Sequence, residues 1–343
     1  MKITRSRIKA IGKKLRYLDE YKALSSNDLS DLTEWRNSHG PSLNYLLRTL
    51  ENIFLDISLD SSQYLITQRL KRIYSIKLKL DRFENMQLSM MDDIAGARGV
   101  VSEIKDVNLI FNLLKEKKFN YTLLKVNNYI SIPKKDGYRS IHLVYRTNKD
   151  PAVQIELQLR SELQHIWATA VEVFGTIVNT SFKTGEGEFE WREFFKLLST
   201  KFAMKEGTTI LAEHERYTVD KIDAMLVKAI KSLNIFEQLT AYTSIYHSDW
   251  QSKRKKGRVG KYALLILNNI TGITDVEFYA DKDRLKGLKR YSEFEKDYIE
   301  SNDINVVFVS VDNMNKLVEA YPNYFMDTKK LLKYLADIVL EKF

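Results

Sequence analysis

The residues best suited to chemistry lie on one face of a short segment, 153–160. Its apolar and polar side chains alternate, which predicts a β-strand with two different faces. The polar face carries Gln154, Glu156, Gln158 and Arg160. A half-buried strand needs an apolar face, but it does not need a carboxylate, two amides and a guanidinium at two-residue spacing. The pattern indicates either a site that binds a polar ligand or a solvated surface.

Two earlier segments favour the binding site. Residues 134–140 lead into a predicted strand over 141–146, and residues 148–151 turn the chain into the strand over 153–160, as expected for a hairpin. Residues 91–101 predict a short strand of small residues that carries Asp93 and Arg98. Three polar segments are therefore expected to meet on one sheet.

The three segments together resemble the synthetase domain of the RelA/SpoT superfamily. The motifs are Asp93-x-x-Gly96-x-Arg98, then Pro133-Lys134-x-x-Gly137-Tyr138-Arg139-Ser140-x-His142, then Glu156-x-Gln158-x-Arg160 followed by Trp167-Ala168. The resemblance covers about residues 35–180. It implies an ATP-dependent enzyme that moves a pyrophosphoryl group to a hydroxyl, usually the ribose 3′-OH of GDP or GTP. A toxic subgroup instead modifies the 3′ end of tRNA.

The resemblance also implies the catalytic residues. Asp93 matches the aspartate that binds Mg²⁺, and Glu156 matches a glutamate that binds metal or assists deprotonation of the acceptor; these two roles stay open. Magnesium usually keeps several waters and takes only one or two protein carboxylates, so the pair suits it. Tyr138 matches the tyrosine that stacks on the acceptor base, and it is expected to be the third catalytic residue.

Basic residues earlier in the chain are expected to hold the phosphates of ATP. Residues 64–83 predict a helix by their apolar spacing, and a charged stripe on such a helix is ordinarily a solvated face. The family resemblance instead implies an ATP-binding set made of Arg69, Lys71, Ser75, Lys79, Arg82 and Arg98. By the same resemblance, the acceptor is bound by Lys134, Tyr138, His142, Gln158 and Arg160.

Composition sets the broad class. The chain has 343 residues, long enough for two domains, and its 54 Lys and Arg against 45 Asp and Glu give a net charge of +9. This excess of positive charge favours anionic partners such as nucleotides or RNA, but it also fits an ordinary basic protein. The lack of cysteine excludes disulfides and cysteine-based zinc sites. Without a secretory signal or a long apolar run, we expect a cytoplasmic protein with no membrane partner.

The order of apolar patterns predicts the architecture. We expect an α/β (α+β) fold in which a mixed, nucleotidyltransferase-like sheet is flanked by helices, plus a small C-terminal α/β region. A helix is predicted over 103–118 and a long one over 219–250, which ends at the basic run 253–258. The predicted domains are a synthetase-like toxin domain over 1–205, a helical linker over 206–258 and a regulatory domain over 259–343.

The C-terminal third resembles that of CapRel-type fused toxin–antitoxin proteins. It implies a metal-free, zinc-finger-like antitoxin domain whose Tyr-x-x-Tyr element, here Tyr321 and Tyr324, holds the enzyme inactive until a phage protein is sensed. The same two tyrosines could instead close the core of the small domain. The predicted function is thus pyrophosphoryl transfer from ATP to the tRNA 3′ end. The alternatives are an alarmone synthetase that uses GDP or GTP and a non-catalytic RNA- or nucleotide-binding module.

Overall fold

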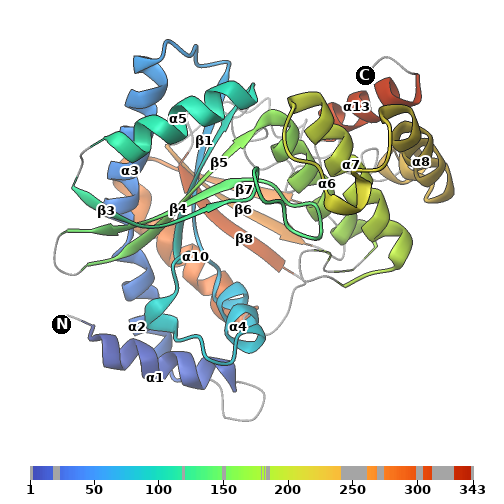
Figure 1. Cartoon of the computed structure of the whole chain (residues 1–343). Coiled ribbons are helices and arrows are strands. Elements are labelled where there is room, and N and C mark those ends of the chain that lie inside the picture. Colours follow the sequence, from blue (N-terminus) through green and yellow to red (C-terminus); the bar gives the residue numbers. More distant parts are fainter. Residues whose placement is uncertain are drawn as a thin grey trace.

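The structure is a computed structural model that describes residues 3–17, 24–117, 120–148, 152–178, 180, 182, 186–240, 261–268, 274–298, 304–310 and 328–340. Two sheets organise this part of the chain (Figure 1). The larger has five strands in the order β1-β2-β5-β4-β3, in which only β2 and β5 are parallel neighbours. The smaller is antiparallel, with the order β7-β6-β8. The expected mixed α/β fold with an extra C-terminal α/β region is confirmed.

The elements follow one another with short connections. The first half comprises α1 (Arg5–Arg16), α2 (Ser26–Asn37), α3 (Gly40–Asp56), β1 (Tyr64–Leu70), α4 (Ile73–Arg82), the 3-10 turn η1 (Leu88–Met90), β2 (Ala95–Val101), α5 (Ile104–Glu116), β3 (Tyr121–Asn128), β4 (Ile141–Thr147) and β5 (Gln154–Ser161). The second half comprises α6 (Glu162–Ile177), α7 (Phe189–Glu206), η3 (Ala212–His214), α8 (Val219–Ser232), β6 (Tyr262–Asn268), β7 (Thr274–Tyr279), η4 (Asp281–Asp283), α10 (Arg284–Asp297), β8 (Ile304–Ser310) and α13 (Lys329–Val339). None of the helices in the described ranges has the length and apolarity needed to cross a bilayer.

The larger sheet is apolar on one face only. Alternation along β2 and β5 places Ala95, Ala97, Ile155 and Leu157 on the face that packs against α3 and α5, where they form one hydrophobic cluster with Leu50 and its neighbours. The opposite face carries the polar partners at the intervening positions. This division leaves the second face free to build a site.

The smaller sheet closes two further clusters. One of its faces, with Ala263, Leu265 and Val307, packs with α6, α7, α8 and α13 into a cluster that also contains Leu65 and Val100 of the larger sheet. Its other face packs against α10 through Tyr262, Leu264, Ile266 and Tyr291. Figure 1 shows α6, α7, α8 and α13 gathered on the side away from α3. Residues 262–310 therefore share a core with the helices that follow β5.

Three expectations about local structure were wrong. The predicted helix over 64–83 is strand β1 followed by helix α4, because β1 pairs with β2 along its whole length and its aromatic and β-branched residues favour a strand. Asp93 precedes β2 in a turn instead of lying in the strand. The long helix over 219–250 breaks after Ser232, where Asn234 adopts a φ of 48°. Residues 241–260 lie outside the described part.

Candidate active site

The register of the strands places the predicted residues on the open face of the larger sheet. Arg98 of β2 lies across from Gln158 of β5, which in turn lies across from His142 of β4. Directly paired residues share a face, and so do residues two apart in one strand. Glu156 and Arg160 therefore join this row on the same face. The alternation seen in the sequence along 153–160 is confirmed as a division between core and open face.

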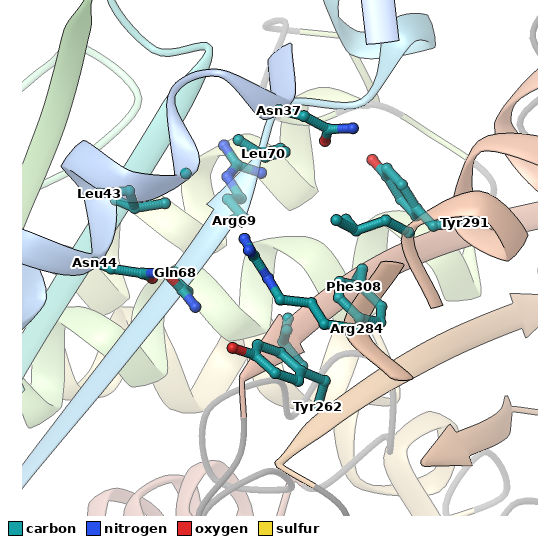
Figure 2. Close-up of a pocket in the computed structure, with 13 residues that line it drawn as sticks. Asn37, Leu43, Asn44, Gln68, Arg69, Leu70, Tyr262, Arg284, Tyr291 and Phe308 are labelled. Carbon is teal, nitrogen blue, oxygen red and sulfur yellow. The ribbon is translucent and has the colours of Figure 1, made fainter. Parts of the chain in front are cut away.

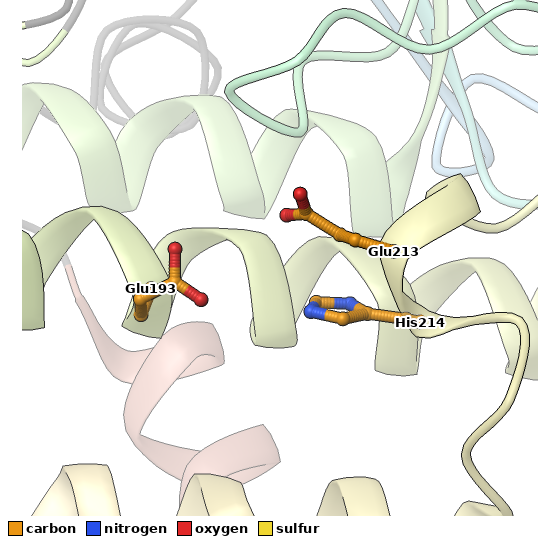
Figure 3. Close-up of side chains that lie close together, drawn as sticks. All are labelled: Glu193, Glu213 and His214. Carbon is orange, nitrogen blue, oxygen red and sulfur yellow. The ribbon is translucent and has the colours of Figure 1, made fainter.

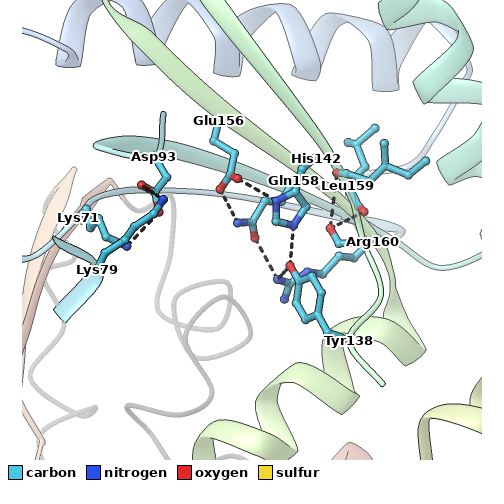
Figure 4. A network of polar contacts seen from close by, with 11 residues as sticks. Lys71, Lys79, Asp93, Tyr138, His142, Glu156, Gln158, Leu159 and Arg160 are labelled. Carbon is cyan, nitrogen blue, oxygen red and sulfur yellow. Dashed lines mark hydrogen bonds and ion pairs between the residues drawn. The ribbon is translucent and has the colours of Figure 1, made fainter. Parts of the chain in front are cut away.

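A continuous chain of hydrogen bonds links these side chains (Figure 4). His142 Nδ1 lies 2.8 Å from Glu156 Oε1, and Gln158 Nε2 donates to Glu156 Oε2 at 2.7 Å. Arg160 Nη2 donates to Gln158 Oε1 at 3.0 Å and to the Tyr138 hydroxyl at 2.7 Å. Tyr138 Oη also lies 2.7 Å from His142 Nε2, which closes the chain into a ring. Each side chain in the ring is thus held in one orientation by two neighbours.

The ring fixes the ionisation of its members. Burial raises the pKa of the Glu156 carboxyl, but the hydrogen bond and charge of His142 overcome this and lower the pKa to about 2. Burial lowers the pKa of His142, but its bonds to Glu156 and Tyr138 raise the pKa above its ordinary value. Glu156 is therefore an anion near neutral pH, and His142 is biased toward its protonated form.

Tyr138 is surrounded by cations. Arg160 lies over its ring at 5.1 Å from the centroid, and Lys134 lies over it at 4.8 Å. Burial raises the pKa of the Tyr138 phenol, but Arg160 and His142 outweigh burial and lower the pKa to about 7. An aromatic base that stacks on Tyr138 competes with these cations for the faces of the ring. The phenol oxygen is already poised to accept hydrogen bonds.

Gly137 shapes the loop that presents Tyr138. Its φ of 94° lies in the left-handed region, and a Cβ atom there would come within 2.8 Å of the Ser199 Cβ on α7. Ser199 Oγ donates to the carbonyl of Gly137 at 2.6 Å and accepts a bond from Arg139 Nε at 2.9 Å. The loop is therefore tied to α7, and only glycine fits at its tightest point.

Asp93 forms a second cluster beside the ring. Lys71 Nζ donates to one of its oxygens at 2.9 Å and Lys79 Nζ donates to the other at 2.8 Å. Burial raises the pKa of Asp93, but the two ammonium groups overcome it and hold the pKa well below its ordinary value. The charge of Asp93 also acts on the pKa of Glu156, so the two carboxylates belong to one electrostatic site. Figure 4 shows both clusters on the same side of the sheet.

Arg98 is a buried cation that faces other cations. Burial, and next the positive charge of Arg160, lower the pKa of its guanidinium to about 10, and Arg69 acts in the same direction. Its Nε makes no hydrogen bond with any of the residues that the structure describes. Buried guanidinium groups bind carboxylates or phosphates where these are available. An anionic ligand on this face would relieve the repulsion.

The remaining ATP-binding candidates are not all brought together. Arg69 lies in β1, Lys71 follows that strand, and Ser75, Lys79 and Arg82 lie on α4, so one helix does not carry the set. Arg82 is exposed over the ring of Phe83, and Ser75 is half-buried on α4. Arg69 lines a narrow cavity of about 40 Å³ whose other wall includes Tyr262 and Arg284 (Figure 2).

Two side chains that the sequence did not single out belong to the site. Tyr129 packs edge-on against both Tyr138 and His142, and Lys134 lies 4.5 Å above its ring. Arg139, although part of the motif, is a buried support that binds Ser199 and the carbonyl of Thr209. The only signal for Tyr129 was its place just before the Lys134 loop, and no periodicity separates it from a surface residue.

The donor set fits a magnesium ion. Asp93 and Glu156 are both ionised, and carboxylate oxygens are the ligands that Mg²⁺ prefers. Lys71 and Lys79 engage both oxygens of Asp93, so these ammonium groups must turn aside when a cation binds. Phosphate oxygens of a nucleotide offer the lysines an alternative partner.

A second group of potential metal ligands lies elsewhere (Figure 3). Glu193, Glu213 and His214 place one ligand atom each within 4.8 Å of one another. Lys196 pairs with both carboxylates, at 2.8 and 3.1 Å, and His214 Nδ1 lies 2.7 Å from the Thr200 hydroxyl. The negative charge is already compensated by the lysine, so this group explains itself as a surface ion-pair network.

Comparisons with known proteins agree with the motifs. The chain is 38% identical over 82 residues to the GTP pyrophosphokinase YwaC of Bacillus subtilis, which covers 22% of this chain and 39% of that protein. It is 31% identical over 111 residues to the GTP pyrophosphokinase YjbM of the same organism, covering 30% of this chain and 52% of YjbM. The chain thus spans about half or less of the length of these relatives.

Among solved structures, the small alarmone synthetase 1 of Bacillus subtilis bound to its product pppGpp aligns with a TM-score of 0.43 at 21% identity. The alignment covers 51% of this chain and 93% of that one. The model of the region found in RelA and SpoT proteins matches residues 68–174, which contain Lys71, Asp93, Tyr138 and Glu156. The chain therefore carries, over residues 68–174, the region found in RelA and SpoT proteins.

Proposed function

We propose that the chain is an ATP-dependent pyrophosphotransferase of the RelA/SpoT type. The observation that carries the proposal is the arrangement of two adjacent charged clusters on one open sheet face. Asp93 lies between Lys71 and Lys79, and Glu156 is held in the ring with His142 and Arg160. One cluster suits a polyphosphate with its cation, and the other suits a hydroxyl-bearing acceptor.

In the proposed reaction, the acceptor oxygen forms a bond to the β-phosphorus of ATP while the bond from that phosphorus to the α,β-bridging oxygen breaks. The hydroxyl proton leaves to a base, and AMP departs with the electron pair. Mg²⁺, held by Asp93 and Glu156, would neutralise charge on the transferring group. Lys71, Lys79 and Arg98 bind phosphate oxygens, and Arg160 and Gln158 orient the acceptor. Glu156, hydrogen-bonded to His142, is the proposed acceptor of the proton.

The proposed acceptor is the 3′ end of tRNA, which would make the protein a translation-inhibiting toxin, with phage defence as the proposed role. The net charge of +9 supports an RNA substrate because a basic chain attracts a polyanion. The second candidate is an alarmone synthetase that acts on GDP or GTP. Its support is that the relatives YwaC and YjbM are named GTP pyrophosphokinases.

We further propose that the C-terminal region, residues 259–343 after a linker over 206–258, keeps the synthetase region over 1–205 inactive until a phage protein binds. Contacts with the described residues support this. Arg284 and Tyr262 share a cavity with Arg69 of the proposed ATP-binding set, and Arg284 lies over the ring of Tyr262 at 5.6 Å. The proposed inhibitory residues Tyr321 and Tyr324 lie outside the described part of the chain.

The test is transfer of label from γ-phosphate-labelled ATP by the full chain with Mg²⁺, offered tRNA, GDP and GTP in separate reactions. Label on tRNA supports the toxin, and label only on GDP or GTP makes the protein an alarmone synthetase. The variant Asp93→Asn must lose the transfer in either case. If wild-type protein binds ATP or RNA yet transfers nothing, even with Tyr321 and Tyr324 substituted, the non-catalytic module is the correct reading.

A further inference from the structure

A buried ion pair joins two parts of the chain that lie far apart in sequence. Arg36, in the last turn of α2, binds both carboxylate oxygens of Glu295 in α10. The side chains of Arg36 and Glu295 are only 1% and 3% exposed. Arg36 Nη2 also donates to the Tyr291 hydroxyl at 2.8 Å. An ion pair buried this deeply adds little net stability compared with apolar residues of similar size, so stability alone is a weak reason for it.

The carboxylate of Glu295 has a third partner. Its Oε1 accepts a hydrogen bond from the backbone N–H of Ile73 at 2.9 Å. Ile73 is the first residue of α4, and the preceding residue, Arg72, makes no side-chain cap. The first N–H groups of a helix have no partner within the helix and favour a negative charge. The carboxylate that caps α4 therefore comes from a helix 222 residues further along the chain.

Helix α4 carries the lysine that the donor phosphates need. Lys79 lies on α4 and Lys71 lies two residues before Ile73, and both bind Asp93. The cap on Ile73 therefore fixes the one point where the chain leaves β1 and enters the helix. Arg36 holds the capping carboxylate from the other side. The acceptor residues His142, Gln158 and Arg160 lie on β4 and β5 and have no connection to this pair.

We infer that Glu295, oriented by Arg36, is a positioning residue for the donor nucleotide: it fixes the start of α4 and through it the two lysines that bind Asp93. This inference rests on the proposed function. The C-terminal region then contributes a component that the ATP-binding set needs, in addition to any inhibitory role. Loss of the cap should weaken the binding of ATP and leave the binding of the acceptor unchanged.

The test compares two double variants of the full chain. Arg36→Met/Glu295→Gln removes both charges but keeps an amide oxygen for the Ile73 N–H, whereas Arg36→Met/Glu295→Met removes that acceptor. Both replace the ion pair with side chains of similar volume, which avoids leaving one charge buried and unpaired. We expect the Met/Met variant to show a KM for ATP about five- to tenfold above that of the Met/Gln variant, with the acceptor KM and kcat little changed. Calorimetric titration with MgATP should show the same loss.

A control pair separates positioning from general loosening. Lys201 and Asp223 form an ion pair between α7 and α8 at 2.7 Å, away from α4. The variant Lys201→Met/Asp223→Asn should leave both KM values unchanged. Equal ATP constants in the Met/Met and Met/Gln variants would overturn the inference, as would a lower KM for ATP or a parallel rise in the acceptor KM. If the wild-type chain neither binds nor uses ATP, it is the proposed function that has failed.

Should the Met/Met variant not fold, Glu295→Asp provides the second measurement. The shorter carboxylate keeps its charge for Arg36 but withdraws from the Ile73 N–H. A selective rise in the KM for ATP supports the inference, and an unchanged KM contradicts it.

Discussion

The Arg160 guanidinium donates a hydrogen bond to the Tyr138 hydroxyl at 2.7 Å and lies over the face of the same ring. One cation thus acts on Tyr138 in two ways, through the phenol oxygen and through the π-system. His142 adds a second hydrogen bond to the same oxygen. These contacts make Tyr138 an unusual acid among the 19 tyrosines of the chain.

The first prediction concerns the ionisation of Tyr138. Because its pKa is lowered to about 7, one tyrosinate should form near neutral pH, whereas unperturbed tyrosines ionise near 10. Difference absorbance during a pH titration should show this early step in the wild type and not in Tyr138→Phe. Arg160→Met should move the step to higher pH. The favourable contribution to stability is present at high pH and is lost as pH falls from about 10 through about 7.

A titration in which Tyr138→Phe keeps the early step would assign it to another tyrosine and contradict the prediction.

The second prediction concerns Asp93. Replacing it with asparagine leaves Lys71 and Lys79 without their ion pairs and removes a ligand for Mg²⁺, so transfer activity should fall by about 10²- to 10³-fold. Asp81→Asn is the matched control, since it also removes an aspartate–lysine pair, with Lys77 on α4 at 3.0 Å. That pair is more exposed, and the control should retain nearly all activity. Comparable losses in both variants would count against a special role for Asp93.

The third prediction concerns the pH dependence of stability through His142. Its pKa is raised in the folded protein, mainly by Glu156, which outweighs burial. The stabilisation is therefore full below about pH 6.5, the unfolded value, and is lost as pH rises through the higher folded pKa. The difference in unfolding free energy between wild type and His142→Gln, measured by urea denaturation, should shrink over that range.

His214→Gln provides the opposite sign. Burial lowers the pKa of His214, so its neutral form is favoured in the folded protein and its contribution is lost as pH falls below about 6.5. Parallel pH slopes for the two variants would show that the contact between His142 and Glu156 does not control the titration.

The fourth prediction separates backbone strain from steric overlap at Gly137. Alanine there must adopt a φ of 94° and place its Cβ 2.8 Å from the Ser199 Cβ. We expect Gly137→Ala to cost about 2–4 kcal/mol in the free energy of unfolding and to raise the KM for the acceptor, since Tyr138 follows directly. Gly207 has a φ of 64° with no atom within 4 Å, so Gly207→Ala should cost only about 1 kcal/mol. Equal costs would mean that packing against α7 is unimportant.

The fifth prediction concerns inhibition by the C-terminal region. Changing Tyr321 and Tyr324 to alanine in the full chain should increase growth inhibition on expression, and adding Asp93→Asn should abolish it. Point variants are preferable to deletion beyond residue 258, because Leu265, Val307 and Val309 share a hydrophobic cluster with α6 and α8 that deletion would expose. Growth unchanged by the tyrosine substitutions would rule out inhibition through these residues.

Local sequence determined the parts of the site that lie within one strand or one turn. The alternation along 153–160 fixed which side chains share a face with Glu156, because the period of a strand is two whatever lies beside it. The Gly137–Tyr138 turn and the hairpin of β4 and β5 were likewise visible in turn residues and apolar runs. The order of the three motifs was specific enough to indicate the RelA/SpoT resemblance.

Only the tertiary structure decided the contacts between distant segments. Residues 64–70 fit a helical spacing in isolation, but pairing with β2 made them a strand and separated Arg69 from the lysine on α4. Nothing local reveals that Arg36 and Ile73 share the carboxylate of Glu295, because burial and charge pairing depend on how α2, α4 and α10 pack. Sequence periodicity specifies the face of an element, whereas the partner of that face is chosen by the free energy of packing the whole chain.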